Sequence, residues 1–378
     1  MSYFRQTRSS RSTWALGSLL LIGFLYFLLS ATSTDLSSID SLLRQRKTQA
    51  AAANPLSPPT SAFRRVAADG QKPLSPPPVV HYQLNNLTAS ANPALKGEKV
   101  LVLTPLSRFY DEYWENLVGL SYPHEHISIG FIIPKTKEGN EATTRLQEAV
   151  KRTQSGPLEK RFQSITILRQ DFEPAVNSQN EKERHKMSMQ AARRASMAKA
   201  RNSLLFTTLG PNTAWILWLD GDIIETPDSL IQDLASFDRD VIVPNCFQRY
   251  VDGNSGKELV RPYDYNSWRD SETAMEMASK MGADDVLLEG YEEMATYRTL
   301  MAMLADTSVN RDERQIMPLD GVGGTALLVK AEVHRDGAMF PPFAFYHLIE
   351  TEGFARMARR LGYESWGLPN YFVYHYNE

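Results

Sequence analysis

Cysteine is almost absent from this sequence. Cys246 is the only one among 378 residues, so no disulfide can form within the chain. Because it follows an apolar run, we interpret Cys246 as a small hydrophobic residue. An excess of positive charge is also missing, since 41 Lys and Arg are balanced by 44 Asp and Glu. A chain without this basic character is not expected to bind DNA or RNA, and we predict no nucleic-acid partner.

Phosphate-binding glycine motifs are missing as well. No G-x-x-x-x-G-K-[ST] sequence occurs, which excludes a P-loop. The glycine-rich stretch Gly321-Val-Gly323-Gly324 precedes an apolar strand, the reverse of the strand-to-helix order of a dinucleotide fingerprint. This order argues against a nucleotide-binding oxidoreductase, which is a rival interpretation of the chain.

One long apolar run is present, from Trp14 to Leu29. It has the composition of a membrane segment or of the apolar core of a signal peptide. Arginines precede the run and aspartates follow it closely, so the positive-inside rule leaves the N-terminus in the cytoplasm. We predict a cytoplasmic tail over residues 1–13 and a transmembrane signal-anchor over residues 14–30, with cleavage of the segment as the alternative.

The composition changes twice after this run. Residues 31–97 are rich in Ala, Ser and Pro, which predicts a lumenal stem that carries one glycosylation sequon at Asn86. In residues 98–378, short apolar runs alternate with amphipathic stretches. The apolar runs predict strands at residues 100–103, 127–133, 165–168, 215–219 and 241–243. The amphipathic stretches predict helices near residues 110–121, 141–153, 187–209 and 228–236. This order predicts a Rossmann-like α/β domain with a mainly parallel central sheet and helices on both faces.

The strand at residues 215–219 leads directly into Asp220-Gly221-Asp222, a D-x-D motif. In an extended chain, side chains two residues apart point the same way, so the carboxylates can converge while Gly221 leaves room for a ligand. Two carboxylates at the carboxyl end of a buried strand favour Mn²⁺ or Mg²⁺, whose shell a diphosphate completes. The alternative is an acidic turn without a ligand. Asp238 and Asp240 repeat the same letters before a strand, where they predict a solvated turn.

Two other stretches are candidates for a nucleotide site. Thr104 and Pro105 follow the first strand, where an α/β domain normally meets a nucleotide. Arg194 and Arg201 are seven residues apart on one predicted helical face, and arginine forks suit a diphosphate. A solvated basic face is the alternative for these arginines.

Acidic residues and a histidine gather near the C-terminus. Asp320 precedes the glycine-rich stretch, and Glu350 and Glu352 open a predicted helix. Either these glutamates belong to a functional site, or they only complement the dipole at the N-terminus of the helix. His375 ends a predicted short strand, and a lone histidine is structural unless it joins a metal.

With these blocks assembled, the chain resembles the fungal Golgi mannosyltransferases of glycosyltransferase family 62. These are subunits of the mannan polymerase complexes that build the α-1,6-mannan backbone of cell-wall glycoproteins. The matching blocks are Val100–Leu106, Arg193–Arg194, Met197–Asn202, Asp220–Asp222, Val243–Asn245, Tyr263–Trp268, Leu288–Tyr291, Leu319–Gly324, Glu350–Phe354 and Gly367–Asn370.

The resemblance implies a GT-A fold in a single-pass type II protein of the Golgi membrane, with the ER as the alternative. It also implies GDP-mannose as donor, Mn²⁺ as cofactor, a retaining reaction and sister subunits in a hetero-oligomer. Carried over to this sequence, the metal ligands are Asp220, Asp222 and His375. The donor-binding residues are Thr104, Pro105, Arg194, Arg201, Asn202 and Asp220. The acceptor-side and catalytic residues are Glu352, Asp320 and Glu350. One departure is Gly221, where a bulkier residue is more usual, so a more flexible metal loop is expected.

The sequence therefore predicts a GDP-mannose-dependent hexosyltransferase that acts in protein glycosylation. It would be a retaining α-mannosyltransferase that extends a mannan or N-glycan outer chain. The alternative is a non-catalytic scaffold subunit of the same complex, against which the intact Asp220, Asp222 and His375 argue.

Overall fold

A ten-stranded mixed sheet forms the centre of residues 82–378, which make up one compact unit. The computed structural model describes residues 79–172, 187–253, 255–291 and 294–377. The strands of the sheet are β1 (Lys99–Pro105), β2 (Ile127–Ile133), β3 (Ser164–Arg169), β4 (Thr213–Leu219), β5 (Ile223–Glu225), β6 (Val241–Val251), β7 (Glu258–Pro262), β10 (Met317–Leu319), β11 (Ala326–Lys330) and β12 (Ser365–His375). A separate two-stranded sheet pairs β8 (Trp268–Arg269) with β9 (Thr299–Leu300).

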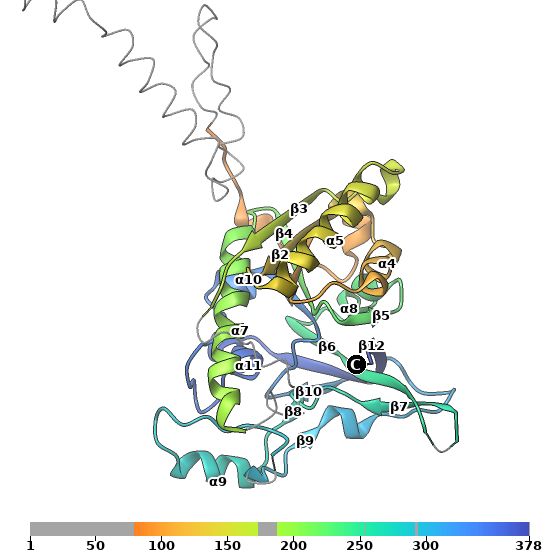
Figure 1. The fold of residues 1–378 in the computed structure, drawn as a ribbon. Helices are drawn as coiled ribbons and strands as arrows, with labels where there is room; N and C mark the ends of the chain where they lie inside the picture. The colour runs from red at the N-terminus through yellow and green to blue at the C-terminus, as the bar shows by residue number, and fades with distance from the viewer. Residues whose placement is uncertain (1–78, 173–186, 254, 292–293, 378) are drawn as a thin grey trace, which may run out of the picture. The chain divides into compact units, whose positions relative to one another are not determined.

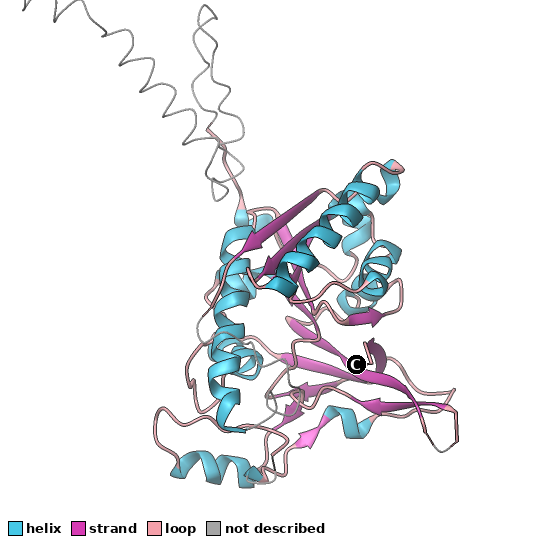
Figure 2. Ribbon diagram, viewed as in Figure 1, coloured by secondary structure: helices cyan, strands magenta, loops and turns pink. Residues whose placement is uncertain are grey.

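Helices flank the sheet, as Figures 1 and 2 show. They are α3 (Pro93–Lys96), α4 (Asp111–Gly119), α5 (Lys137–Gln154), α7 (Met187–Thr208), α8 (Leu230–Ala235), α9 (Glu272–Lys280), α10 (Ala331–Arg335) and α11 (Glu350–Arg360). Short 3₁₀ turns occur at Leu84–Asn86, His124–His126, Leu158–Lys160 and Met301–Leu304. The strands and helices predicted between residues 100 and 243 are all present, although β6 extends well beyond its predicted end.

The sheet is parallel over its first half. Strands β3, β2, β1 and β4 lie side by side and run in one direction. Strand β11 is then inserted antiparallel between β4 and β6, while β6 and β12 run parallel to each other. Strands β5, β7 and β10 pair antiparallel at the β6–β12 end. The predicted parallel core is confirmed, and the antiparallel strands were not predicted.

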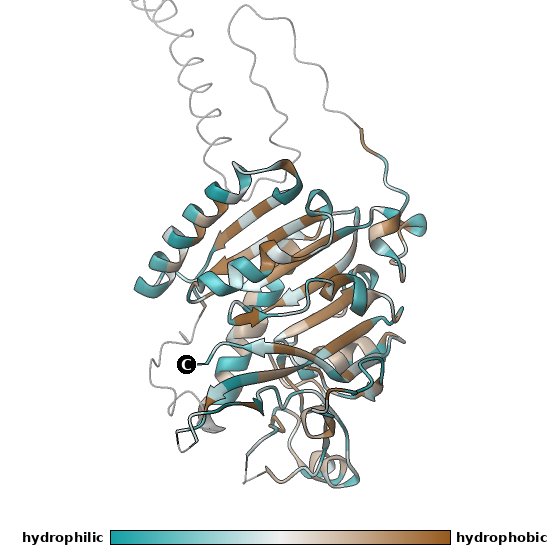
Figure 3. Cartoon of the chain, turned by 90° about the vertical axis from the view of Figure 1, so that its right-hand side faces the viewer, coloured by the Kyte–Doolittle hydropathy of each residue, from teal (hydrophilic) through white to brown (hydrophobic). Residues whose placement is uncertain are grey.

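Alternating residues of the strands bury two separate cores, one on each face of the sheet. In β1, Val100 and Val102 pack with α4, α5 and α8, whereas Leu101 and Leu103 pack with α7, α10 and α11. Figure 3 shows these strands as mostly hydrophobic, which is expected for a sheet covered on both faces. The predicted arrangement of helices on both faces is therefore confirmed.

Residues just before β1 also contact the folded unit. Pro93 is buried, and Ala89 and Ala94 pack against the core beneath α4 and α8. The Glu98 carboxylate accepts hydrogen bonds from the Ser90 backbone N–H and from Trp215 Nε1, both at 3.1 Å. These residues fall within the range expected for the stem, so ordered structure begins upstream of residue 98.

The predicted tail, the signal-anchor and residues 31–78 of the predicted stem lie outside the described residues. Within the residues that are described, no helix is both long and apolar enough to span a membrane.

Candidate functional site

The two aspartates of the D-x-D motif lie where β4 ends. The Asp220 backbone N–H donates to the Thr325 carbonyl at 2.9 Å, and Ile223 N–H donates back to the Asp220 carbonyl at 3.1 Å. Residues 220–223 therefore form a tight turn instead of the extended segment that was expected. The two carboxylates have different partners, Arg201 for Asp220 and His375 for Asp222. Asp222 is still close enough to raise the pKa of Asp220, so their convergence on one ion stays a prediction.

The sequence predicted that Gly221 leaves room for a ligand, but the space beside this glycine is filled. A Cβ atom built at this glycine would lie 2.4 Å from Leu106 Cδ1 and 3.5 Å from Thr104 Cγ2. The glycine instead lets the aspartate turn pack against the end of β1. Thr104 is itself buried, with Oγ1 2.7 Å from the Tyr113 hydroxyl. Thr104 and Leu106 therefore lie beside the aspartate turn, and the donor-binding role of Thr104 stays a prediction.

Asp222 is paired with His375 through the register of β5 and β12. The antiparallel pairing places His375 opposite Ile223, and Tyr376 N–H donates to the Asp222 carbonyl at 2.7 Å. The His375 Nε2 atom then lies 3.0 Å from Asp222 Oδ2. The imidazole is buried and stacks on the Tyr263 ring, with centroids 3.6 Å apart. A long strand, rather than the short one predicted, brings this histidine to the aspartate turn.

The tautomer of His375 follows from its second contact. Its Nδ1 lies 2.6 Å from the Tyr376 carbonyl oxygen, which can only accept, so Nδ1 carries a hydrogen. In the neutral ring, Nε2 then presents a lone pair beside the Asp222 carboxylate. Burial lowers the pKa of His375, but Asp222, the Tyr376 carbonyl and Asp220 outweigh it and raise the pKa above its usual value. The pair is therefore completed by a proton or by another cation.

Arg201 connects Asp220 to Glu350. Its Nη2 lies 2.9 Å from Asp220 Oδ1 and its Nε lies 3.2 Å from Glu350 Oε1. The Arg201 side chain is only 2% exposed, so the alternative of a solvated basic face is wrong for this residue. Burial, Asp222 and Glu350 together raise the pKa of Asp220 to about 7, although Arg201 acts to lower it. The site is crowded with carboxylates around one guanidinium group.

Arg194 lies about two helical turns before Arg201 on α7. It is also buried, but it makes a different contact. Its Nη1 lies 2.6 Å from Glu352 Oε2, and its Nη2 donates to Asn266 Oδ1 at 2.8 Å. The other Glu352 oxygen accepts from Trp268 Nε1 at 2.9 Å, and the Glu352 side chain is fully buried. Burial alone would lower the pKa of Arg194, but the Glu352 and Glu350 carboxylates raise it overall. Glu352 is thus an internal anchor for Arg194 and Trp268, beyond the dipole role weighed for it.

The remaining predicted residues have structural partners. Asp320 accepts a hydrogen bond from the Asp270 backbone N–H at 2.9 Å and pairs with Arg359. Asn202 forms two hydrogen bonds with the Phe340 backbone, of 2.7 and 2.9 Å. Pro105 ends β1. These contacts position the loops around the site but do not group Asp320 or Asn202 with Asp222.

The glycine-rich stretch between β10 and β11 explains how these side chains come together. A Cβ atom would lie 2.5 Å from the Trp268 ring at Gly321, 1.6 Å from Asp264 Oδ2 at Gly323 and 2.7 Å from Arg201 Nη2 at Gly324. No side chain larger than hydrogen fits at these distances. The stretch is therefore a close-packed backbone wall of the site, not a dinucleotide fingerprint.

A metal ion fits part of the predicted ligand set. In the portion of the chain that is described, no group of three His, Cys, Asp or Glu side chains is arranged to hold a metal. Among the buried side-chain atoms without a hydrogen-bond partner in the described residues are His375 Nε2 and Arg201 Nη1, both at this site. The lone pair of His375 Nε2, beside the partly exposed Asp222 carboxylate, suits a borderline cation such as Mn²⁺. The Arg201 Nη1 N–H group suits an anion. Asp222 and His375 are the two residues that would hold the ion, with Asp220 turned to Arg201.

Two residues of the site had no role assigned from the sequence. Trp268 contacts Glu352, and Tyr263 stacks on His375. Both lie in the block Tyr263–Trp268, whose density of aromatic and polar residues was the available signal.

The D-x-D repeat at Asp238 and Asp240 is a turn paired with Lys330, whose Nζ lies 3.1 and 3.4 Å from the two carboxylates.

Comparisons with known proteins identify a family and several relatives of the chain. Residues 78–344 match the family model Anp1. The chain is 53% identical over 297 residues to the Mannan polymerase complex subunit mnn9 of Schizosaccharomyces pombe, covering 79% of this chain and 86% of that protein. It is also 53% identical to the Mannan polymerase complex subunit MNN9 of Candida albicans, covering 79% and 80%. Identity to the Mannan polymerase II complex anp1 subunit of Schizosaccharomyces pombe is 38%, covering 74% and 64%.

Solved structures overlap the chain only loosely. The mannosyltransferase PcManGT from Pyrobaculum calidifontis, solved with GDP-Man and Mn²⁺, covers 77% of this chain and 59% of its own at a TM-score of 0.38 and 11% identity. An overlap of that size does not establish a common fold.

Proposed function

The chain belongs to the Anp1 family, and from that premise we propose that it is a mannan polymerase subunit that transfers mannose from GDP-mannose with retention of configuration. The acceptor is an α-linked mannose chain of a glycoprotein, extended through α-1,6 linkages. In this proposal the unit of residues 82–378 has a GT-A fold and faces the Golgi lumen. A signal-anchor at residues 14–30 holds the chain in the membrane as a type II protein, and related subunits assemble with it.

The observation that carries the proposal is the pairing of His375 with Asp222 at the end of β4. A buried imidazole nitrogen without a hydrogen-bond partner lies 3.0 Å from a carboxylate that is partly open to solvent. Two acceptors do not stay this close unless a proton or a metal cation joins them, and we propose that in the working protein a metal cation takes this place. Bound there, Mn²⁺ would supply Lewis-acid neutralisation of the diphosphate charge.

Arg201 is proposed to act on the donor side. Its Nη1 N–H is buried without a partner, while Asp220 and Glu350 hold the rest of the guanidinium group in place. A fixed positive charge of this kind stabilises negative charge that develops on a leaving diphosphate. Thr104 and Pro105 at the end of β1 are proposed to border the same donor site.

The carboxylates of α11 are proposed to serve the acceptor. Glu350 shares Arg201 with Asp220, and its side chain is 12% exposed. Of the two glutamates, it is therefore the one that can face a sugar hydroxyl. Glu352 is fully buried, and we assign it a positioning role through Arg194 and Trp268. Asp320 is assigned a similar role through Arg359 and the backbone of Asp270.

A transfer assay tests the proposal. The full chain, alone and together with a related subunit, is given GDP-mannose, Mn²⁺ and an α-linked mannose acceptor. We expect a mannosylated product that disappears in Asp222→Asn and when the metal is chelated. No product from the wild-type chain in either setting would contradict the proposed activity.

A scaffold subunit is the second candidate, because one observation favours it. Glu352, a predicted catalytic residue, has no exposed surface and both of its oxygens are engaged within the fold. A scaffold would keep these contacts without any turnover. The two candidates differ in a mixed complex: a scaffold predicts that Asp222→Asn in this chain leaves transfer by the complex unchanged.

A further inference from the structure

A pocket of about 270 Å³ lies beside the site, between α9 and the segment that precedes α11. Ala274, Met275 and Ala278 of α9 form an apolar side, and Asp270, Arg298 and Arg356 supply charged groups. The side chains of Arg298 and Asp270 are 2% and 13% exposed, whereas Met275 is 54% exposed as a residue. The pocket therefore combines buried polar groups with an accessible apolar edge, which is the usual composition of a small-molecule site.

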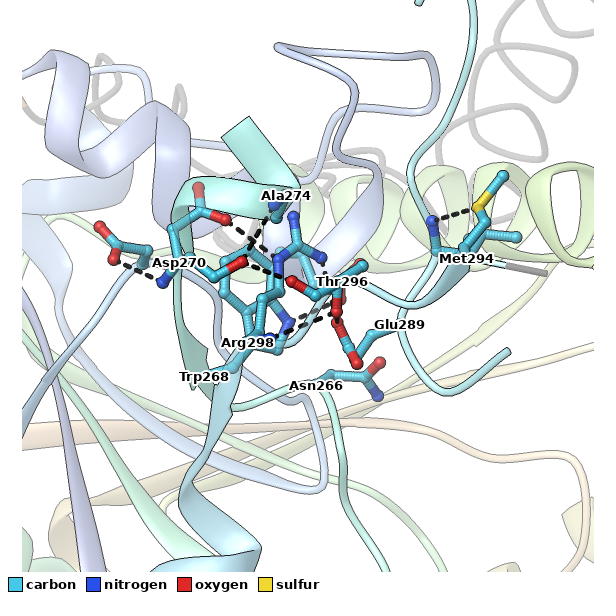
Figure 4. A network of polar contacts seen from close by, with 12 residues as sticks. Asn266, Trp268, Asp270, Ala274, Glu289, Met294, Thr296 and Arg298 are labelled. Carbon is cyan, nitrogen blue, oxygen red and sulfur yellow. Dashed lines mark hydrogen bonds and ion pairs between the residues drawn. The ribbon is translucent and has the colours of Figure 1, made fainter. Parts of the chain in front are cut away.

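The charges around the pocket compensate one another. Arg298 Nε lies 3.1 Å from Asp270 Oδ1 and its Nη1 lies 3.4 Å from Glu289 Oε2. Arg356 Nη2 lies 3.1 Å from the second oxygen of Asp270. Figure 4 shows Arg298 lying over Trp268 between Asp270 and Glu289. Two guanidinium groups are thus matched by two carboxylates, so a neutral ligand is favoured over a phosphate.

One donor at this pocket has no acceptor. In the described part of the chain, Arg356 Nε is buried without a hydrogen-bond partner. A buried N–H of this kind costs free energy until an oxygen reaches it. The side chains of Arg356 and Asp270 are 24% and 13% exposed, so the pair offers donor and acceptor groups that suit neighbouring hydroxyl groups.

The opposite side of the pocket is a strained turn that presents an aromatic ring. Tyr346 and His347 have φ values of 53° and 61°, in the left-handed region, between the bridged residues Phe345 and Leu348. Neither is a glycine, so both residues are held in a strained backbone conformation. The Tyr346 residue is 55% exposed although it lines the pocket. An exposed ring beside hydroxyl-binding groups matches the apolar face of a sugar.

The pocket is linked to the proposed acceptor side through α11 and Trp268. Glu352 and Arg356 are four residues apart on α11 and therefore lie on the same face, one turn apart. The Trp268 ring donates to Glu352 through Nε1 and carries Arg298 3.5 Å above its centroid. A sugar beside Arg356 would thus lie nearly two helical turns from the start of α11, where Glu350 is located.

We propose that this pocket binds a neutral hexose unit of the acceptor chain, one that is not itself the site of transfer. The proposal rests on the proposed function for the identity of the sugar, and it makes the protein favour acceptors of more than one unit. Asp270 and Arg356 hold the hydroxyl groups, and Tyr346 covers the apolar face of the ring.

A binding measurement without donor tests this proposal. The full chain is titrated with α-linked mannotriose, and Ala278→Leu fills the pocket from the accessible helix α9. We expect the affinity to fall by about tenfold or more, because a leucine removes contact surface in the pocket. Ala283→Leu is the matched control, since Ala283 is exposed and does not line the pocket, and it should bind as the wild type does. Thermal unfolding of both variants establishes that they are folded.

A second variant separates the polar contact from the shape. Arg356→Lys keeps a positive charge beside Asp270 but removes the Nε donor, and it should also weaken mannotriose binding. Equal affinity of wild type, Ala278→Leu and Arg356→Lys, or no mannotriose binding by the wild type, would overturn the proposal. Preferential binding of inorganic phosphate at this pocket would overturn it too.

The outcome for GDP distinguishes this proposal from the proposed function. If mannotriose binding depends on Ala278 while GDP and Mn²⁺ do not bind, the pocket stands as a hexose site and the transferase assignment fails. If GDP and Mn²⁺ bind but mannotriose does not, the pocket is wrong and the donor site stands.

Discussion

His375 Nε2 and Asp222 Oδ2 lie 3.0 Å apart, joined by the pairing of β12 with β5 although the two residues are far apart in sequence. The same register stacks His375 on Tyr263 and ties Tyr376 to the Asp222 carbonyl. The imidazole is therefore held in place by the fold, while the carboxylate remains partly open. This geometry is the basis of the metal and donor assignments.

Glu352→Gln should destabilise the protein strongly. It removes one charge of a fully buried pair and leaves the Arg194 guanidinium uncompensated, which costs about 3–5 kcal/mol. Asp222→Asn is the matched change at a side chain that is 37% exposed, and it should alter the free energy of unfolding by about 1 kcal/mol or less. Urea unfolding of both variants measures the difference. Equal stabilities would show that Glu352 is not the internal anchor described above.

Gly323→Ala should disrupt the wall of the site. The new Cβ atom would meet Asp264 Oδ2 at 1.6 Å, and over-packing of this kind costs about 1–3 kcal/mol or more. Gly253→Ala is the control, because no heavy atom lies within 4 Å of its Cβ position. Thermal unfolding should separate the two variants. A wild-type midpoint for Gly323→Ala would mean that the backbone wall can move freely.

The stability of the protein should fall as the pH drops from 6.5 to about 4 because of His334. Burial lowers the pKa of this imidazole from 6.5 to about 4. Between these values the unfolded state binds a proton that the folded state does not, so the stabilisation is complete above pH 6.5 and is lost on acidification. The full loss from this group is about 3 kcal/mol.

A His334→Gln variant is the control for that pH dependence. Glutamine can accept from Trp218 Nε1, which lies 3.2 Å from His334 Nε2, but it does not titrate. Its free energy of unfolding should therefore change less than that of the wild type between pH 7.5 and pH 5. Identical pH profiles would assign the acid sensitivity to other groups.

The N-terminal limit of the folded unit can be tested by truncation. A chain that begins at residue 82 keeps Pro93, Ala89 and Ala94 in contact with the core, whereas one that begins at residue 98 loses them. We expect the shorter form to be less stable by about 1–2 kcal/mol, since each buried CH₂ contributes about 0.8 kcal/mol. Chemical unfolding of both forms measures this. Equal unfolding midpoints for the two forms would show that residues 82–97 belong to the stem.

The strands of the parallel core could be predicted because their signals are local. Continuous apolar runs at Ile127–Ile133 and Trp215–Leu219 have one interpretation in an α/β chain, and both form strands. The end of β6 could not be predicted in the same way. Pro244 follows Val243 and suggests a break, yet β6 continues because Pro244 lies at a shift in the register with β12.

The site was predictable in its composition but not in its pairings. Asp220, Asp222 and His375 were selected from the sequence, and the fold brings Asp222 and His375 together. The different partners of Asp220 and Asp222 follow from a tight turn that the extended-chain argument did not include. Arg194 and Arg201 share a helical face, but their burial depends on Glu352 and Glu350, which are distant in sequence and reach them only through the fold.

The most direct test of the account is calorimetric titration of GDP into the full chain with and without Mn²⁺. We predict that Mn²⁺ strengthens GDP binding in the wild type, because Asp222 and His375 would hold the ion and its positive charge would attract the diphosphate. Asp222→Asn and His375→Ala should each lose this increment while remaining folded. If GDP affinity is the same with and without Mn²⁺, or if both variants keep the full increment, the pairing of Asp222 and His375 is structural and the metal-dependent donor site is contradicted.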